Sequence, residues 1–192
     1  MKKLHFFVGL AFVFALSLAG CARPPVEEMN NAIEAVTRAE NDNDAILYAP
    51  TTLARAREAL ARMRQEADAR RFDVAMAYAA EAVASAERAI AEGRAGAERA
   101  RRDAHALITD LPPLIAETEH GMSAARDAGL DLDFDSLEGD LNGARVNANQ
   151  AVEAYSFGLY GEALAQGRSA RNGLLDINQR IASAAVAVPT KK

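Results

Sequence analysis

Apolar residues recur every three or four positions along most of the chain, and this spacing predicts amphipathic helices. A first helix is expected over residues 27–40, before turn-forming residues at 41–44. A second helix is expected to start near Pro50, because proline suits the first helical turn, and to close at 70–73. Its apolar stripe consists of Leu53, Ala56, Leu60, Met63 and Ala67.

A stripe of small residues follows, in alternating steps of four and three. Its members are Ala75, Ala79, Ala82, Ala86, Ala89, Gly93, Gly96 and Ala100. This heptad-like seam has no large side chains, so it lets a partner helix approach closely. The same helix is expected to continue to Leu111 and to break at Pro112 and Pro113.

The remaining sequence predicts three more helices. One spans 114–128 and ends at Gly129, a C-cap residue. Asp135, with Glu138 three residues later, resembles a capping box that starts the next helix, which runs through Leu141 to Tyr155. The third spans roughly 159–185. No segment shows the sustained alternation of a β-strand, so the predicted fold class is all-α.

The predicted architecture is an elongated bundle of long antiparallel helical hairpins. One hairpin region spans 27–111, a second spans 112–186, and a frayed tail spans 187–192. The hairpins resemble each other over 53–90 and 137–181. The aligned pairs are Phe72 with Tyr160, Ala75 with Ala163, and Ala82 with Ala170. The spacer between the leucine and the aromatic residue differs by four residues, about one helical turn.

The N-terminus has the order of a secretory signal peptide. Lys2 and Lys3 precede a nearly unbroken apolar stretch over 6–18, which is too short to predict a membrane-spanning helix. Leu18-Ala19-Gly20-Cys21 follows and resembles the bacterial lipoprotein signal. In that family the cysteine sulfur carries a diacylglycerol, the chain is cut just before the cysteine, and the new amino group is usually acylated too.

This resemblance implies a lipid anchor at Cys21 and signal cleavage between Gly20 and Cys21. One acyl chain binds a membrane marginally, at about 0.8 kcal/mol per buried methylene, whereas two or three chains hold it nearly permanently. Cys21 is the only cysteine, so it has no disulfide partner in the chain. By the sorting behaviour of many Gram-negative lipoproteins, which this sequence resembles, Ala22 in place of aspartate implies the outer membrane. The alternative is an ordinary secretory signal with an incidental cysteine at its edge.

Removal of residues 1–20 leaves 172 residues with a formal charge of −7, because Lys2 and Lys3 are lost with the signal. This acidic balance argues against general nucleic-acid binding. Residues 21–26 then form the acylated cysteine and a short spacer stiffened by two prolines. No later apolar run is long enough to cross a bilayer, so the folded part is expected in the periplasm.

The N-terminal half carries a second resemblance. The proline pair after Cys21, an alanine-bearing helix and the segments "YAPTTLARAREAL" and "RRFDVAMAYAAEAVASAERA" are similar to a family of bacterial envelope lipoproteins known only as a domain of unknown function. The similarity covers residues 21–95. It implies a place in the cell envelope and a helical fold, and it carries no catalytic mechanism.

Catalysis and metal binding find little support in the sequence. Lipidation would use the single cysteine, and no nucleophile, base and orienting group can be named together. Glu117 and His120 share a helix face, but they supply at most two of the four ligands of a structural zinc site. His105 is the other histidine beyond the signal. No enzyme activity, metal or cofactor is therefore expected.

The acidic segment 131–136 begins like a calcium-binding loop, because alternate carboxylates could converge on a hard cation. It departs from that pattern at Ser136, where the loop needs a glycine, and at Asn142, where it needs a glutamate. We interpret it as an acidic connection that caps the following helix. Leu132 and Phe134 would then close the apolar end of the bundle.

Arginines are dense between positions 55 and 102, and include Arg55, Arg62, Arg64, Arg70, Arg71, Arg99, Arg101 and Arg102. They could meet an anionic polymer or lipid headgroups, since guanidinium pairs with phosphate and carboxylate. Acidic residues are interspersed among them, namely Glu58, Glu66, Asp68, Glu81, Glu87, Glu92 and Glu98. We therefore favour a salt-bridged, solvated helix face.

The sequence favours a non-enzymatic outer-membrane lipoprotein whose periplasmic bundle is a scaffold or interaction module. The expected partners are the membrane, through the lipid, and an envelope protein, peptidoglycan or a second copy of the chain. One alternative is a module that holds a small apolar or anionic ligand, lined by Phe72, Tyr78, Tyr155, Phe157 and Tyr160. Another is a tether attached to peptidoglycan through Lys192.

Overall fold

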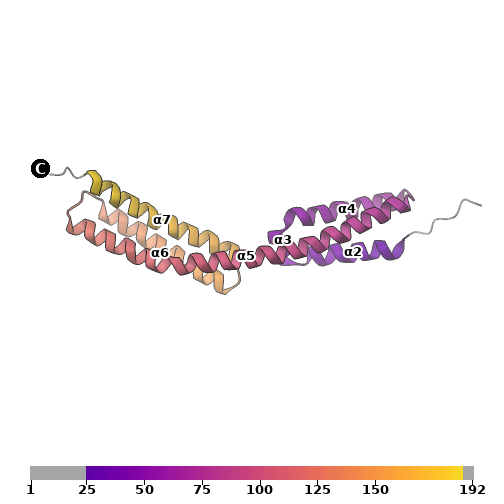
Figure 1. The fold of residues 1–192 in the computed structure, drawn as a ribbon, viewed down its shortest axis with the longest axis horizontal. Coiled ribbons are helices and arrows are strands. Elements are labelled where there is room, and N and C mark those ends of the chain that lie inside the picture. Colours follow the sequence, from indigo (N-terminus) through magenta and orange to yellow (C-terminus); the bar gives the residue numbers. More distant parts are fainter. Residues whose placement is uncertain (1–24, 188–192) are drawn as a thin grey trace, which may run out of the picture. The chain divides into compact units, whose positions relative to one another are not determined.

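The protein is an all-α helical bundle in the computed structural model, which describes residues 25–187 (Figure 1). Every regular element in this range is a helix, as the sequence predicts. None of these helices is both long enough and apolar enough to cross a membrane. The predictions for Gly20, Cys21 and Lys192 concern positions outside the described residues.

The chain divides into two compact units between Gly93 and Arg94. The first contains α2 (Val26–Glu40), α3 (Asn43–Tyr48), α4 (Pro50–Asp68) and the first part of α5 (Phe72–Asp127). The second contains the rest of α5, α6 (Phe134–Ser156) and α7 (Tyr160–Ala187). The division falls inside α5, whereas the predicted boundary follows residue 111, at the proline pair.

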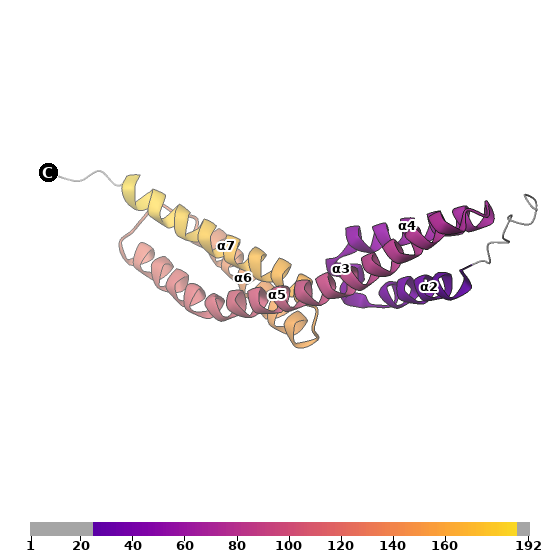
Figure 2. The same cartoon turned by 45° about the vertical axis from the view of Figure 1, so that its right-hand side comes forward.

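The core of the first unit is built mainly of alanine. α2, α4 and the first part of α5 lie side by side in both views (Figures 1 and 2). All but four of the buried residues in this core are alanine, and the exceptions are Val36, Leu53, Leu60 and Met63. The seam residues at positions 75–89 belong to this core, together with residues of α2 and α4. This part of the seam is therefore used for packing within the chain.

α3 is a short helix that the sequence pattern did not predict. Asp42 is its N-cap, and its Oδ1 accepts a hydrogen bond from the Ala45 N–H at 2.9 Å. Ala45 is fully buried in the core of the first unit. Residues 41–44 thus do more than end α2, since their capping chemistry starts a second helix at once.

The core of the second unit contains larger side chains. Leu111, Leu137, Leu174 and Ile177 are fully buried there. The side chains of residues 132 and 134 pack against this core, as predicted for the end of the bundle. Each buried leucine or isoleucine contributes more apolar area than an alanine does, so this core has more apolar bulk per position.

The predicted capping box at the start of α6 is wrong. The N-cap is Asp133 rather than Asp135, and its Oδ1 accepts from the Ser136 N–H at 3.0 Å. Glu138 instead pairs with Arg126 of α5 at 2.7 Å. The acidic segment therefore caps the helix, as interpreted, but through a residue two positions earlier.

α5 runs through Pro112 and Pro113, so the predicted break at these residues is also wrong. Each proline removes a helical N–H and costs about 3 kcal/mol in a helix interior. Both prolines are exposed, so water can hydrate the carbonyl groups that lose their partners. On either side, Leu111 is buried in the core, and fully buried Thr118 accepts a hydrogen bond from Asn178 of α7 at 3.0 Å. Packing of both flanks holds the helix continuous.

The two hairpins repeat one core pattern at a constant separation of 88 residues. The paired buried positions include Leu53 with Leu141, Ala56 with Ala144, Met63 with Ala151, Ala75 with Ala163, Ala82 with Ala170, and Ala89 with Ile177. The turns match as well, because Arg70 and Gly158 both have a positive φ, of 58° and 74°. The four-residue difference disappears once Leu53 is aligned with Leu141 instead of Leu137.

Gly93 marks a close approach of two backbones. A Cβ atom added there would lie 2.5 Å from the Ala45 nitrogen and 2.6 Å from the Asp44 carbonyl carbon. We predict that Gly93→Ala lowers the free energy of unfolding by about 1–3 kcal/mol, because backbone atoms of α3 must move. The loss should appear in urea unfolding of the full chain, although alanine is the better helix former.

Gly143→Ala in α6 is the matched control. A Cβ atom there would meet nothing within 4 Å, so only the helix propensity changes. This variant is expected to gain up to about 1 kcal/mol. If both substitutions changed the free energy of unfolding by the same amount and in the same direction, the close contact at Gly93 would not be the reason for glycine at that position.

Candidate functional site

Backbone hydrogen bonds fix the turn between α6 and α7. Gly158 has a φ of 74°, and its N–H donates to the Tyr155 carbonyl at 3.0 Å. The Leu159 N–H donates to the Ala154 carbonyl at 2.9 Å. This is the pattern of a Schellman helix end, in which glycine takes the left-handed conformation. The turn therefore presents its side chains in a defined arrangement.

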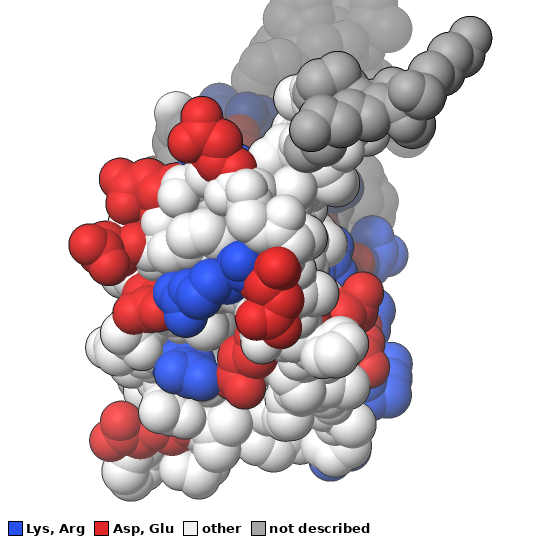
Figure 3. All heavy atoms as spheres, turned by 90° about the vertical axis from the view of Figure 1, so that its left-hand side faces the viewer, with Lys and Arg blue, Asp and Glu red and all other residues white. Residues whose placement is uncertain are grey.

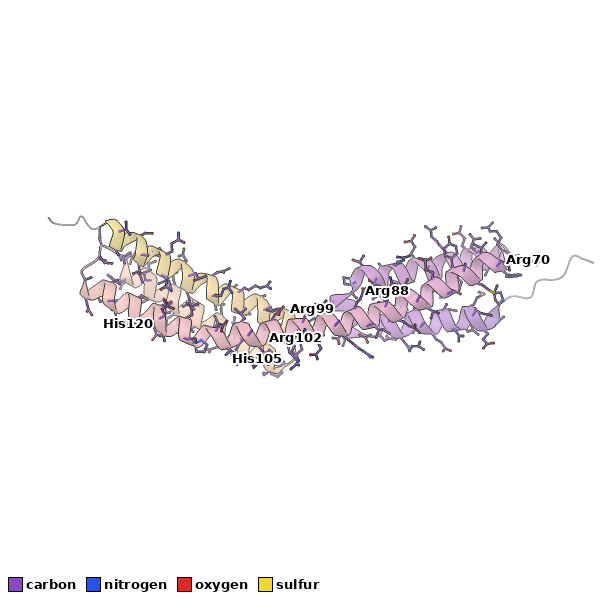
Figure 4. All side chains as sticks on the ribbon, viewed as in Figure 1. Arg70, Arg88, Arg99, Arg102, His105 and His120 are labelled. Atoms are coloured by element: carbon purple, nitrogen blue, oxygen red, sulfur yellow. The ribbon has the colours of Figure 1, made fainter. Side chains whose placement is uncertain are left out.

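Aromatic residues gather at this turn. The rings of Tyr155 and Tyr160 have their centres 5.4 Å apart, and the ring of His105 lies 6.0 Å from that of Tyr155. Figure 4 shows His105 on α5. Phe157, within the turn itself, has 72% of its surface exposed. An exposed ring on a rigid turn is a candidate contact for a ligand or partner.

A groove of about 360 Å³ lies between the end of α6 and the start of α7. Its lining consists of Gln150, Glu153, Ala154, Phe157, Leu159, Glu162 and Gln166. No basic residue lines it. The side chains of its two glutamates and two glutamines have no hydrogen bond or ion pair with any described residue. The groove therefore offers free acceptors and donors beside an exposed apolar surface.

In the first hairpin, the charged residues that correspond to the groove lining are all in ion pairs. The corresponding pairs, 88 residues apart, are Arg62 with Gln150, Arg71 with Leu159, and Tyr78 with Gln166. Arg62 pairs with Glu58 at 2.8 Å, and its guanidinium lies 5.9 Å from the centre of the Tyr78 ring. Arg71 pairs with Glu66. The hairpins thus share a core but differ in this surface.

The structure brings together three of the five aromatic residues predicted to line a ligand site, Tyr155, Phe157 and Tyr160. Phe72 and Tyr78 lie on α5 in the first unit and do not belong to this turn. A lining formed by all five residues together stays a prediction.

Three groups at the turn were missing from that lining, namely His105, Glu153 and Glu162. A signal for the turn exists in the sequence once the hairpins are aligned at 88 residues. Ala67 and Ala69 then stand opposite Tyr155 and Phe157, so the repeat does not require aromatic residues there.

Half of the arginines named in the sequence form ion pairs with nearby glutamates, and for these the predicted salt-bridged face is confirmed. The pairs are Arg55–Glu81, Arg62–Glu58, Arg71–Glu66 and Arg101–Glu98. Arg64, Arg70, Arg99 and Arg102 have no partner among residues 25–187. Figure 3 looks from another side, at the part of the chain that lies on the left of Figure 1, and acidic and basic side chains lie interleaved there too. Neither sign of charge forms a continuous patch there.

Metal-ligating side chains do not gather in the described part of the chain. Between residues 25 and 187, no three side chains of His, Cys, Asp or Glu are placed to hold a metal ion. Glu117 and His120 are exposed on α5, and Figure 4 labels His120 on that helix. In the acidic segment 131–136, Asp133 serves as a helix cap.

The first unit and the start of the second match a known protein family. Residues 27–105 match the Domain of unknown function (DUF4398). No curated protein and no solved structure matches the chain. The match supports the predicted resemblance to a domain of unknown function. The DUF4398 region includes the contact at Gly93, whereas the groove between α6 and α7 lies beyond its end.

The ion pair between Arg71 and Glu66 at the first hairpin turn predicts a shifted pKa for Glu66 that can be measured. The hydrogen bond from Arg71 lowers the pKa of Glu66 below its ordinary value. A carboxyl group with a lowered pKa stabilises the fold above its unfolded pKa, and this contribution is lost as the pH falls through the folded pKa. In Arg71→Ala we expect the Glu66 pKa to rise to its ordinary value, measured by NMR titration of the side-chain carboxyl.

Arg70→Ala is the control for this titration. Arg70 is the neighbouring cation, and its guanidinium has no hydrogen-bond or ion-pair partner among the described residues. Its removal is expected to leave the Glu66 pKa unchanged. An equal rise in both variants would mean that the general charge of the turn, rather than the hydrogen bond, sets the pKa.

Proposed function

We propose that the protein is a lipid-anchored helical scaffold of the bacterial cell envelope, whose second unit serves as an interaction module. The proposed role involves no catalysis. Its body would lie in the periplasm, held at the outer membrane by acyl chains on Cys21. The membrane would be one partner, and an envelope protein would be the other.

The order of residues at the N-terminus supports the anchor. Two lysines, an apolar stretch and the sequence Leu18-Ala19-Gly20-Cys21 follow one another as in bacterial lipoprotein signals. The single cysteine then has a role as the acylated residue. With an anchor at the first mature residue, the helical units would extend from a fixed point on the membrane.

The contrast between the two hairpins is the observation that carries the interaction role. The six pairs of core positions named above are buried in both hairpins, so this shared core does not explain their different turn surfaces. The first surface pairs its own charges, whereas the second exposes Phe157 beside polar groups that have no partner. Exposed apolar surface rimmed by polar groups is typical of an interaction site.

The anchor is tested by Cys21→Ser, which removes the only thiol. The wild-type protein is expected to incorporate alkyne-labelled palmitate and to show the mass of the acyl groups on an N-terminal Cys21. The variant is expected to incorporate none. Ala22→Asp is the control, because it keeps the cysteine and should retain the acyl mass. An unacylated wild-type N-terminus would contradict the anchor.

The same mass measurement on enzymatically digested cell-wall sacculi distinguishes a covalent tether. A scaffold that acts through protein partners is expected to carry an unmodified Lys192. A muropeptide on Lys192 would instead make the protein a link between membrane and wall, which is the alternative that the sequence offers.

A further inference from the structure

We infer that the groove between α6 and α7 binds a short protein segment in which an apolar side chain stands beside lysine or arginine. The inference deepens the proposed interaction role and rests on it. The site consists of Gln150, Glu153, Phe157, Leu159, Glu162 and Gln166.

The charge of the groove selects the sign of the partner. Glu153 on α6 and Glu162 on α7 line it from opposite helices, and neither has a cationic partner in residues 25–187. No arginine or lysine lines the groove. A partner segment with one or two cations would therefore supply the missing complement, whereas an anionic ligand would be repelled.

The apolar part of the groove favours a partner that brings an apolar side chain over a small inorganic cation. Phe157 is 72% exposed and Leu159 is 52% exposed. Both flank Gly158, whose left-handed conformation fixes the turn before any partner arrives. Little backbone conformational entropy would be lost at these two residues on binding, which makes them suitable anchors.

The length of the groove limits the partner to a short segment. Gln150 lies in α6, and Phe157 is the C-cap of that helix seven positions later, which corresponds to about 10 Å. That distance fits two turns of a helix or three extended residues. Gln150 and Gln166 each carry a donor and an acceptor, so they can pair with the peptide groups of such a segment.

The first hairpin shows that these features are additions to the fold. Position 69, opposite Phe157, is alanine, and position 71, opposite Leu159, is arginine. Arg62 and Arg71 there are already paired with glutamates. The same core thus carries one surface with its charges neutralised internally and one surface with its acids free.

The test uses the full-length protein in nanodiscs of zwitterionic lipid, with empty nanodiscs as the blank. Two fluorescein-labelled probes are compared by fluorescence anisotropy, the peptide Lys-Leu-Lys-Leu-Lys and its counterpart with glutamate in place of lysine. We expect the lysine peptide to bind. Glu153→Lys/Glu162→Lys should weaken its affinity by about tenfold or more and should create binding of the glutamate peptide.

Glu27→Lys/Glu28→Lys on α2 is the matched control, since it makes the same change of net charge at exposed positions outside the groove. Its affinity for the lysine peptide should stay within about twofold of the wild type. Phe157→Ser should weaken binding of the same peptide while the salt dependence persists. Circular dichroism checks that each variant keeps its helices.

Three results would overturn the inference. These are equal losses in the groove variant and the α2 control, no binding of the lysine peptide to the wild type, and tighter binding of the glutamate peptide. An unacylated Cys21 with the expected peptide binding would remove the anchor and leave this site standing. Acylated Cys21 without peptide binding would do the reverse, so the two failures are distinguishable.

Discussion

Close approach of helices through small side chains is the constraint on which the first unit depends. Twelve of the sixteen buried residues in its core are alanine, so each of these contacts removes little apolar area from water. Stability must then come from many short contacts between backbones that lie near one another. Gly93 is where this demand is most specific, because a single methyl group would meet the backbone of α3. The DUF4398 match covers this same region.

The second unit solves the same packing problem with different side chains. Ala86 and Ala89 of the first hairpin correspond to Leu174 and Ile177, and both pairs are fully buried. Larger core residues give the second unit more apolar area per position. Its surface has also diverged, since the turn after α6 carries Phe157 where the first hairpin carries an alanine. The two hairpins therefore share a core register and differ in the residues of the turn.

Helical periodicity was sufficient to predict the all-α fold and most helix positions, because each helix buries one regular stripe. The break at Pro112 failed as a prediction because the cost of proline is local, whereas the packing of Leu111 and Thr118 is visible only in three dimensions. The cap of α6 was misassigned because Asp133 and Asp135 are both suitable caps by composition.

The candidate site was predicted only in part, because the sequence spacing does not show which of the aromatic residues lie at the same turn. Tyr155, Phe157 and Tyr160 stood out as aromatic residues, but helical spacing alone could not separate them from Phe72 and Tyr78. The free state of Glu153 and Glu162 is a property of what surrounds them, and no linear pattern encodes it. Comparison of the two hairpins provides this information. Surface residues that differ between them are not required by the core that they share.

The alanine residues at positions 75–89 of the α5 seam are buried against α2 and α4 within the chain. This packing is tested by the rate at which a thiol reagent modifies Ala82→Cys, compared with Ala84→Cys, both in a Cys21→Ser background. Ala82 is fully buried and Ala84 is exposed on the same helix. We expect the thiol at position 82 to react at least about a hundredfold more slowly, because it becomes accessible only through local opening of the bundle. Equal rates, or a rapid disulfide between two copies through position 82, would contradict the claim.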